Sequence, residues 1–348
     1  MYALVRPLLF RLEAERAHAL TLKLLNAAHG LGLLVPPAAG AAPVRLMGLS
    51  FANRIGLAAG FDKNASCVDA LGALGFGFVE VGTVTPQPQP GNARPRVFRL
   101  PRAGAIINRM GFPNEGVAAL CAHLKLRRFR GICGINIGKN AATALECASQ
   151  DYVACLQAVY PLADYVAVNI SSPNTAGLRQ LQQEAALAPL LESLLEARSR
   201  LAARHGRQVP LLVKLAPDLA PEELDSIARL LGALRIDGVI ATNTTVSRAG
   251  VESLAHAQES GGLSGRPLQG LALAAVERLR RALGPAITLI GVGGIDGAQS
   301  ARAMLGAGAD LIQLYTGLVY RGPALVRELA RVSPQKDRLD EDRSSVRR

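Results

Sequence analysis

The sequence alternates short apolar runs with longer stretches at helical spacing, and this alternation constrains the fold more than any other feature. Eight apolar runs end in clusters of Asn, Lys, Thr, Ser or Gly, and they cover Ile55–Ala59, Phe78–Val81, Ile132–Ile137, Tyr165–Ile170, Leu211–Leu215, Gly238–Ala241, Ile287–Ile290 and Asp310–Leu314. This order predicts parallel strands joined by right-handed helical crossovers. Eight such units predict an α/β protein with a (β/α)8 TIM barrel, whose active site lies at the C-terminal ends of the strands.

Lysine is rare, and its placement points to the same end of the barrel. Only six of the 39 basic residues are Lys, and three of these, Lys63, Lys139 and Lys214, lie at or just past predicted strand ends. An ammonium makes a compact point contact to an anion or a ring nitrogen, whereas a guanidinium is forked. We therefore expect an anion-binding site there; the alternative is a chance cluster of solvated lysines.

Length and composition favour one barrel with an appendage. With 348 residues and 49% hydrophobic content, the chain can bury a large core. We expect an N-terminal helical extension over 1–37, the barrel over 43–332 and a disordered tail over 333–348. No apolar run is long enough for a membrane-spanning helix, and the N-terminus does not resemble a secretory signal. These features favour a cytoplasmic protein.

The cysteines and histidines do not form a metal or disulfide pattern. The five cysteines lack a CxxC pair and the five histidines are dispersed, so we expect free thiols and no metal. A net charge of +12 raises the question of nucleic acid, but no RNA-binding signature accompanies it, so no nucleic-acid partner is expected. An anionic membrane surface suits the charge at least as well.

The first 35 residues carry more apolar surface than a helix packed on one side requires. Met1–Leu12 and Glu13–Ala28 have apolar residues at helical spacing, with Arg6 and Arg11 in the first segment. The pattern predicts two basic amphipathic helices that attach to a membrane surface. The alternative is a pair of helices that only caps the bottom of the barrel.

Side-chain amides dominate the predicted mouth of the barrel. Asn136, Asn169, Asn174 and Asn243 lie at or just past the ends of predicted strands, and an extra element between 85 and 131 is expected to form a hairpin over the mouth. A ring of amides suits a flat ligand whose edge alternates N–H and C=O groups, such as a pyrimidine. Carboxylates are nearly absent, apart from Asp62, so the site favours an anion.

Glycine-rich turns follow the last two predicted strands. Gly291–Ile295 and Tyr315–Gly317 each open a helix, and backbone N–H groups in such turns bind phosphate. The spacing does not match GxGxxG, so a dinucleotide fold is not indicated. Together with Lys63 and Lys214, the turns favour a phosphate that carries a planar redox ring.

Eight motifs in order resemble the dihydroorotate dehydrogenases of the quinone-dependent, membrane-associated class. They are AGFDK (59–63), GTVTP (82–86), NRMGF (108–112), GINIGK (134–139), NISSPN (169–174), ATNTT (241–245), GGLSGRP (261–267) and GVGGI (291–295). The resemblance runs from about Pro43 to Val326. Phe61 and Thr316 depart slightly from the family pattern, which has Leu and Ser at these positions.

The resemblance implies a cofactor and a substrate site. FMN would contact Ala59, Gly60, Phe61, Asp62, Lys63, Thr83, Asn136, Asn169, Lys214, Thr242, Gly265, Gly294, Tyr315 and Thr316. Dihydroorotate would contact Lys63, Asn108, Arg109, Met110, Gly111, Phe112, Asn169, Asn174, Asn243 and Thr244. The implied chemistry removes a proton from C5 and a hydride from C6, giving orotate.

Position 172 distinguishes the classes within this resemblance. Soluble relatives have Cys as the catalytic base, and the quinone class has Ser, as here at Ser172. A serine hydroxyl is a weak base at neutral pH, so its proton needs an acceptor, which the sequence does not show. The alternative role for Ser172 is a hydroxyl that only positions the substrate.

The resemblance also implies an electron acceptor and a location. The two N-terminal helices would form the mouth of a quinone tunnel, with His18 and Arg99 at its inner end; His18 could equally be a surface histidine. The implied protein is a monomer, peripheral to the inner membrane on its cytoplasmic side, and acts in pyrimidine biosynthesis.

Two other functions fit parts of the sequence. A flavin barrel that reduces uracil rings in tRNA would suit the basic charge. Such an enzyme needs a Cys proton donor and a separate RNA-binding region, and the sequence shows neither. A non-catalytic membrane scaffold or ligand-binding barrel would not need both lysines, the Asn set and Ser172. The presence of bound, coloured cofactor would distinguish an enzyme from a scaffold.

Overall fold

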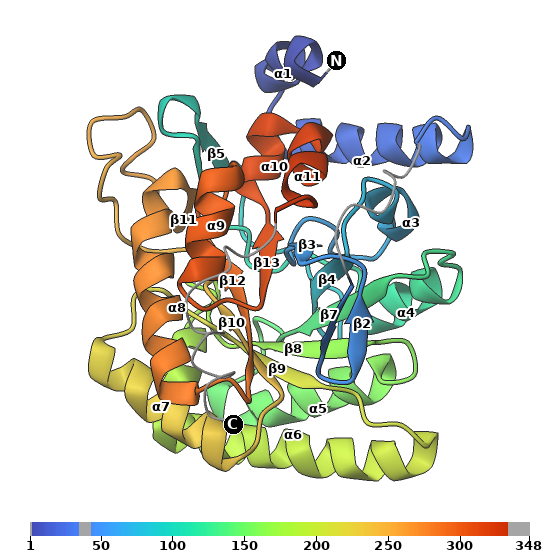
Figure 1. Cartoon of the computed structure of the whole chain (residues 1–348), viewed down its shortest axis with the longest axis vertical. Helices are drawn as coiled ribbons and strands as arrows, with labels where there is room; N and C mark the ends of the chain where they lie inside the picture. The colour runs from blue at the N-terminus through green and yellow to red at the C-terminus, as the bar shows by residue number, and fades with distance from the viewer. Residues whose placement is uncertain (1, 35–42, 333–348) are drawn as a thin grey trace, which may run out of the picture.

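The computed structural model describes residues 2–34 and 43–332, and its centre is a closed barrel of eight parallel strands (Figure 1). In chain order the strands are β3 (Ile55–Leu57), β4 (Phe78–Val84), β7 (Ile132–Ile137), β8 (Tyr165–Asn169), β9 (Leu211–Leu215), β10 (Gly238–Ala241), β12 (Thr288–Val292) and β13 (Leu311–Leu314). Strand β13 pairs with β3 and closes the ring. The predicted eight-stranded barrel is confirmed, although β4 runs three residues past its predicted end and β3 stops two residues earlier.

Helices follow the strands and cover the outside of the barrel. They are α3 (Val68–Gly72), α4 (Val117–Lys125), α5 (Ala148–Val159), α6 (Glu184–His205), α7 (Pro221–Ala233), α8 (Gln269–Leu283), α9 (Ala298–Gly306), α10 (Thr316–Arg321) and α11 (Pro323–Leu329). Short 3-10 turns occupy Pro101–Ala103, Leu145–Cys147, Leu178–Gln182 and Arg266–Leu268. Leucine and valine side chains of these helices pack on the outward faces of the strands, which forms the larger of the core layers.

A smaller apolar layer fills the inside of the barrel near its N-terminal end. The antiparallel pair β1 (Val44–Leu46) and β2 (Leu49–Phe51) closes this end. Phe51 is fully buried there and meets the ring of Phe78 edge to face. The interior residues of the strands above pack into the same layer. The bottom of the barrel is therefore sealed by this pair of strands.

A second sheet stands beside the mouth of the barrel. Strands β5 (Val97–Leu100) and β6 (Ala105–Asn108) form the predicted hairpin, which turns at Gly104 in a left-handed conformation with φ 57°. Strand β11 (Gly262–Gly265) adds an antiparallel third strand to β6. This third strand was not predicted, because it comes from a segment about 150 residues farther along the chain.

The two N-terminal helices lie at the mouth of the barrel. Helix α1 spans Tyr2–Arg11 and α2 spans Ala14–Gly30. Helix α2 packs on α3 and β5, and Figure 1 shows it lying across the end of the molecule opposite α6. The Glu13 carboxylate caps its first turn by accepting hydrogen bonds from the N–H groups of Glu15 and Arg16. The alternative in which these helices cap the bottom of the barrel is therefore wrong.

The predicted disordered tail and most of the Pro-rich linker lie outside the described residues. Within the described ranges, none of the helices has the length and apolar character needed to cross a membrane.

Candidate active site

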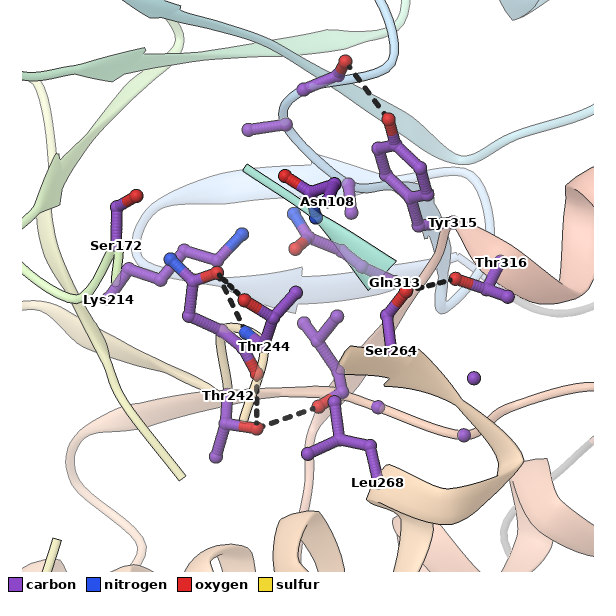
Figure 2. A pocket seen from close by; sticks show the side chains of 18 of the residues that line it. Asn108, Ser172, Lys214, Thr242, Thr244, Ser264, Leu268, Gln313, Tyr315 and Thr316 are labelled. Atoms are coloured by element: carbon purple, nitrogen blue, oxygen red, sulfur yellow. Dashed lines mark hydrogen bonds between the residues drawn. The ribbon is translucent and has the colours of Figure 1, made fainter. Parts of the chain in front are cut away.

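A cavity of about 140 Å³ opens at the C-terminal ends of the barrel strands. Its walls come from seven of the eight strand ends and from the second sheet, and Figure 2 shows the side chains converging on it. The inward-facing residues of strands alternate with the outward-facing ones, so only every second residue of each strand can reach this space. The predicted polar clusters meet here because parallel strands end on the same side.

The amides around the cavity are joined in one directed chain of hydrogen bonds. Asn243 Nδ2 donates to Asn169 Oδ1 at 3.3 Å, and Asn169 Nδ2 donates to Thr83 Oγ1 at 2.8 Å. The Thr83 hydroxyl donates to Asn136 Oδ1 at 2.5 Å, and Asn136 Nδ2 donates to Glu80 Oε1 at 2.9 Å. A carboxylate only accepts, so Glu80 fixes the direction of every bond in the chain.

Glu80 itself is completely buried inside the barrel. Its other oxygen accepts hydrogen bonds from the Tyr165 hydroxyl at 2.8 Å and from Gln313 Nε2 at 2.7 Å. Gly134 makes room for this arrangement, since a Cβ there would stand 2.0 Å from the Tyr165 ring. Three donors to one carboxylate offset much of the cost of burying it.

Two of the three predicted lysines reach the cavity. The Lys214 ammonium is buried and makes no hydrogen bond within the described part of the chain. Burial lowers its pKa and the charge of Glu80 opposes that shift. Lys63 Nζ donates to the Gly60 carbonyl at 2.8 Å, and burial lowers its pKa to about 8. Lys139 points elsewhere, since its ammonium binds carbonyls of its own loop, so its predicted role at the anion site is wrong.

Ser172 lies in the loop after β8 with its side chain at the cavity wall. Its oxygen accepts a hydrogen bond from the Asn174 N–H at 3.2 Å, and its hydroxyl proton has no acceptor among the described residues. Across the cavity, Asn174 Nδ2 donates to Asn108 Oδ1 at 3.2 Å. The loop after β8 and the second sheet thus meet over the place where a small ring would lie.

The turn after β12 offers backbone donors. The N–H groups of Gly293, Gly294 and Ile295 donate to no group in the described ranges. Gly294 has a φ of 71° and packs so closely on α8 that a Cβ would stand 2.4 Å from Gln269. Beside this turn, the hydroxyls of Ser264 and Thr316 are 2.8 Å apart (Figure 2). Consecutive free N–H groups with two hydroxyls nearby form a suitable binding site for a phosphate.

A second, larger cavity of about 520 Å³ lies between the N-terminal helices and the barrel mouth. Its lining is mostly apolar and includes His18 and Arg99. The Arg99 guanidinium donates to the carbonyls of Leu9 and Phe10 and lies 4.6 Å from the centre of the Phe10 ring. The two cavities share five wall residues, which are Lys63, Asn108, Met110, Ser264 and Tyr315.

Comparison with known proteins gives one consistent result. The family model described as dihydroorotate dehydrogenase matches residues 41–333. The protein named dihydroorotate dehydrogenase (quinone) of Nitrosospira multiformis is 57% identical over 332 residues, which cover 95% of each chain. Its counterpart in Paraburkholderia xenovorans is 54% identical over 330 residues, covering 94% of this chain and 97% of its own. The chain belongs to the dihydroorotate dehydrogenase family.

Solved structures agree with this family. The Eimeria tenella dihydroorotate dehydrogenase in complex with ferulenol superposes with a TM-score of 0.84 at 35% identity, covering 91% of this chain and 90% of that one. Its ligand-free form gives 0.83 at 36% identity, covering 90% and 93%. The fold, the family and the enzyme class predicted from the sequence are confirmed.

Most residues that the dihydroorotate dehydrogenase motifs indicate do line the first cavity. For the flavin these are Ala59, Gly60, Lys63, Thr83, Asn169, Lys214, Thr242, Gly265, Gly294, Tyr315 and Thr316. For the substrate and the base they are Asn108, Met110, Gly111, Phe112, Ser172, Asn174, Asn243 and Thr244. Their contacts with a ligand stay a prediction.

Four of the indicated residues do not line it. The Asp62 carboxylate is buried and accepts from the N–H groups of Ser66 and Cys67. Phe61 lines the second cavity, and Asn136 supports the amide chain from behind. Arg109 pairs with Glu259 at 2.6 Å and stacks over Phe98.

Glu80 and Gln313 are functional residues that the sequence motifs do not indicate. The sequence places Asp62 near the mouth as the exception to a lack of carboxylates, yet Glu80 lies directly behind the amides. Each of these polar residues lies within an apolar strand, and this position was the signal available in the sequence. Glu80 comes two residues after Phe78 and Gln313 two residues after Leu311, so each points to the same inward side as that apolar residue. A polar residue on the buried face of a barrel strand indicates a partner inside.

Proposed function

We propose that this protein oxidises (S)-dihydroorotate to orotate, with FMN as the hydride acceptor and a membrane quinone as the terminal electron acceptor. The observation that carries the proposal is the pair of cavities with a common wall. One is lined by several amides and two ammonium groups, and the other is mostly apolar and covered by the N-terminal helices. A small anionic ring fits the first cavity and a quinone fits the second. A flavin at the wall that the two cavities share would accept electrons from the ring and pass them to the quinone.

The residues present fit a flavin mononucleotide. Its phosphate would bind the free N–H groups of the Gly293–Ile295 turn and the hydroxyls of Ser264 and Thr316. Lys214 has an ammonium without a partner in the described ranges, and a cation of this kind stabilises negative charge on the pyrimidine edge of a flavin. When bound, the flavin supplies a two-electron acceptor that the side chains cannot provide.

The chain's own residues would bind and deprotonate the substrate. Lys63 and the amides of Asn108, Asn174 and Asn243 offer a cation and donors to a carboxylate and a ring edge. Ser172 Oγ would take the C5 proton while its own hydroxyl proton passes to a water molecule in the cavity. Its neighbouring N–H from Asn174 holds the oxygen in place, and the burial of Ser172, with 5% of its surface exposed, keeps bulk water away.

The second cavity supports a quinone as the electron acceptor. It is lined by apolar residues of α1 and α2, with His18 and Arg99 as its polar members, which we propose as the quinone contacts. Several leucines of these helices face outward; Leu4 is 79% exposed and Leu8 is 62% exposed. With Arg6 and Arg11 alongside, this surface fits peripheral attachment to the cytoplasmic side of the inner membrane.

The position of the cysteines argues against the tRNA-modifying alternative. None of the five cysteines lines the first cavity, and burial raises the pKa of Cys155 and Cys133, to about 12 for Cys133. The position that faces the cavity carries Ser172. A cysteine proton donor therefore has no place at this site.

One assay tests the proposed function directly. The purified full chain should be yellow, release FMN on denaturation and bleach anaerobically when dihydroorotate is added. It should then reduce a short-chain quinone with dihydroorotate as the electron source. A colourless folded preparation would support a scaffold instead, and a bound flavin that dihydroorotate does not bleach would exclude this substrate.

A further inference from the structure

Two polar groups of residues that line the first cavity have no hydrogen-bond partner in the described ranges. Gln313 is 1% exposed, and its Nε2 donates to Glu80 at 2.7 Å. Its Oε1 is buried and has no hydrogen-bond partner in the described ranges. Lys214 Nζ has no acceptor there either, and Figure 2 shows the side chains of Lys214 and Gln313 reaching toward one another.

We propose, building on the function proposed above, that Glu80 and Gln313 are positioning residues that keep Lys214 charged and oriented toward the flavin. Glu80 supplies the buried negative charge, and Gln313 transmits it as an oriented amide whose oxygen faces the ammonium. The same carboxylate ends the amide chain that runs through Asn136 and Thr83. One buried carboxylate thus maintains the charge of Lys214 and also fixes the direction of the hydrogen-bond donors at the flavin site.

The charges around Lys214 favour this role for Glu80. Burial lowers the pKa of Lys214, and Glu80 is the charged group that raises it. Tyr165 also faces Glu80, but burial raises its pKa well above the usual value, so it stays neutral. Tyr315 is likewise held neutral, with a pKa raised to about 12. Lys63 lines the same cavity and has a pKa lowered to about 8, so a test must separate it from Lys214.

The reduction potential of the bound flavin provides that test. A reduced flavin anion keeps the nearby ammonium protonated, whereas the oxidised ring does not. Above the pKa of Lys214 in the oxidised protein, reduction therefore takes up an extra proton, and the potential falls more steeply with pH. The midpoint potential would be measured against reference dyes across the alkaline pH range. A plot of this potential against pH bends at the pKa of Lys214, and the pH of the bend would be compared between variants.

Glu80→Gln should move the bend to lower pH by about one unit, because an opposite charge nearby shifts a pKa by about that much or more. Gln313→Leu should move it in the same direction by a smaller amount. Glu277→Gln, at an exposed site on α8, should leave it in place. Lys214→Met should remove it, and any bend that persists in Lys214→Met belongs to Lys63.

An unmoved bend in flavin-loaded Glu80→Gln would overturn the inference. If Glu80→Gln does not fold, Gln313→Leu decides, because Asn136 and Tyr165 still donate to Glu80 in that variant. An unmoved bend there would have the same consequence. If the unmodified protein binds no flavin, both proposals fail. If its flavin is bleached by dihydroorotate but the bend does not respond to Glu80, only this inference fails.

Discussion

His18 on α2 donates a hydrogen bond from Nε2 to the carbonyl oxygen of Phe61 at 2.8 Å, and the two rings meet edge to face with their centres 4.9 Å apart. Phe61 belongs to the loop after β3, which also carries Gly60 and Lys63. This contact therefore joins the N-terminal helices to the wall between the two cavities. It holds the half-buried His18 ring at the wall of the second cavity.

Burial of His18 makes stability depend on pH. Burial lowers its pKa to about 4, whereas an unfolded histidine titrates near 6.5. Between these values the unfolded chain binds more protons, so stability should fall as pH falls from about 6.5 towards 4. Urea unfolding of His18→Gln at several pH values should show a weaker dependence in this window. His256→Gln, at a side chain 53% exposed, serves as the control; equal pH dependence in all three proteins would contradict the prediction.

Lys63 should control substrate capture at alkaline pH. Its pKa is lowered to about 8, mainly by burial, so the free enzyme loses this cation above that pH. Because dihydroorotate is an anion, kcat/KM should fall above about pH 8, and this ratio reports groups of the free enzyme. Lys63→Gln should have a low kcat/KM without that decline. A decline that persists unchanged in Lys63→Gln would assign it to another group.

Ser172→Ala should retain bound flavin while its reduction by dihydroorotate slows by about 100- to 10,000-fold, the usual contribution of general acid–base catalysis. Stopped-flow bleaching of the flavin measures this step alone. Ser172→Cys should keep part of the rate with a shifted pH profile, because a thiol titrates lower than a hydroxyl. A near-normal rate in Ser172→Ala would show that the hydroxyl only positions the substrate.

Deletion of residues 2–11 should separate the two electron acceptors. It removes α1, which lines the second cavity through Tyr2, Val5, Leu9 and Phe10, but leaves α2 and its contacts in place. Membrane binding and oxidation by a long-chain quinone should fall sharply, whereas a water-soluble acceptor should still work. Vesicle sedimentation and the ratio of the two acceptor rates provide the measurements. An unchanged ratio would exclude a quinone entrance at α1.

The ion pair between Glu15 and Arg96 should stabilise the attachment of α2. Glu15 accepts two hydrogen bonds from the Arg96 guanidinium, at 2.9 and 3.0 Å, and the side chains are 13% and 4% exposed. Removing one partner of such a pair leaves a buried charge, so Glu15→Gln should lower the free energy of unfolding by about 3 kcal/mol. Glu196→Gln breaks an exposed pair with Arg200 and should cost less than about 1 kcal/mol. Equal losses in urea unfolding would contradict this ranking.

The sequence by itself determined the barrel and the general location of the site. Strand order follows from local alternation of apolar and helical segments, and parallel strands place their C-terminal residues together, so Asn169, Lys214 and Asn243 could be assigned to one mouth. The family motifs were readable for the same reason, because each occupies a few consecutive residues. These are short-range properties that need no knowledge of packing.

Tertiary structure alone decided which side chains face the cavity and what supports them. Lys139 follows a strand like Lys63, yet its ammonium turns to its own loop. Glu80 and Gln313 are 233 residues apart in sequence and meet only because β3 alone separates β4 from β13 in the closed barrel, where both side chains point inward. The N-terminal helices lie at the mouth because Glu15 and His18 find their partners there, and a pairing between distant segments leaves no local periodicity that the sequence could reveal.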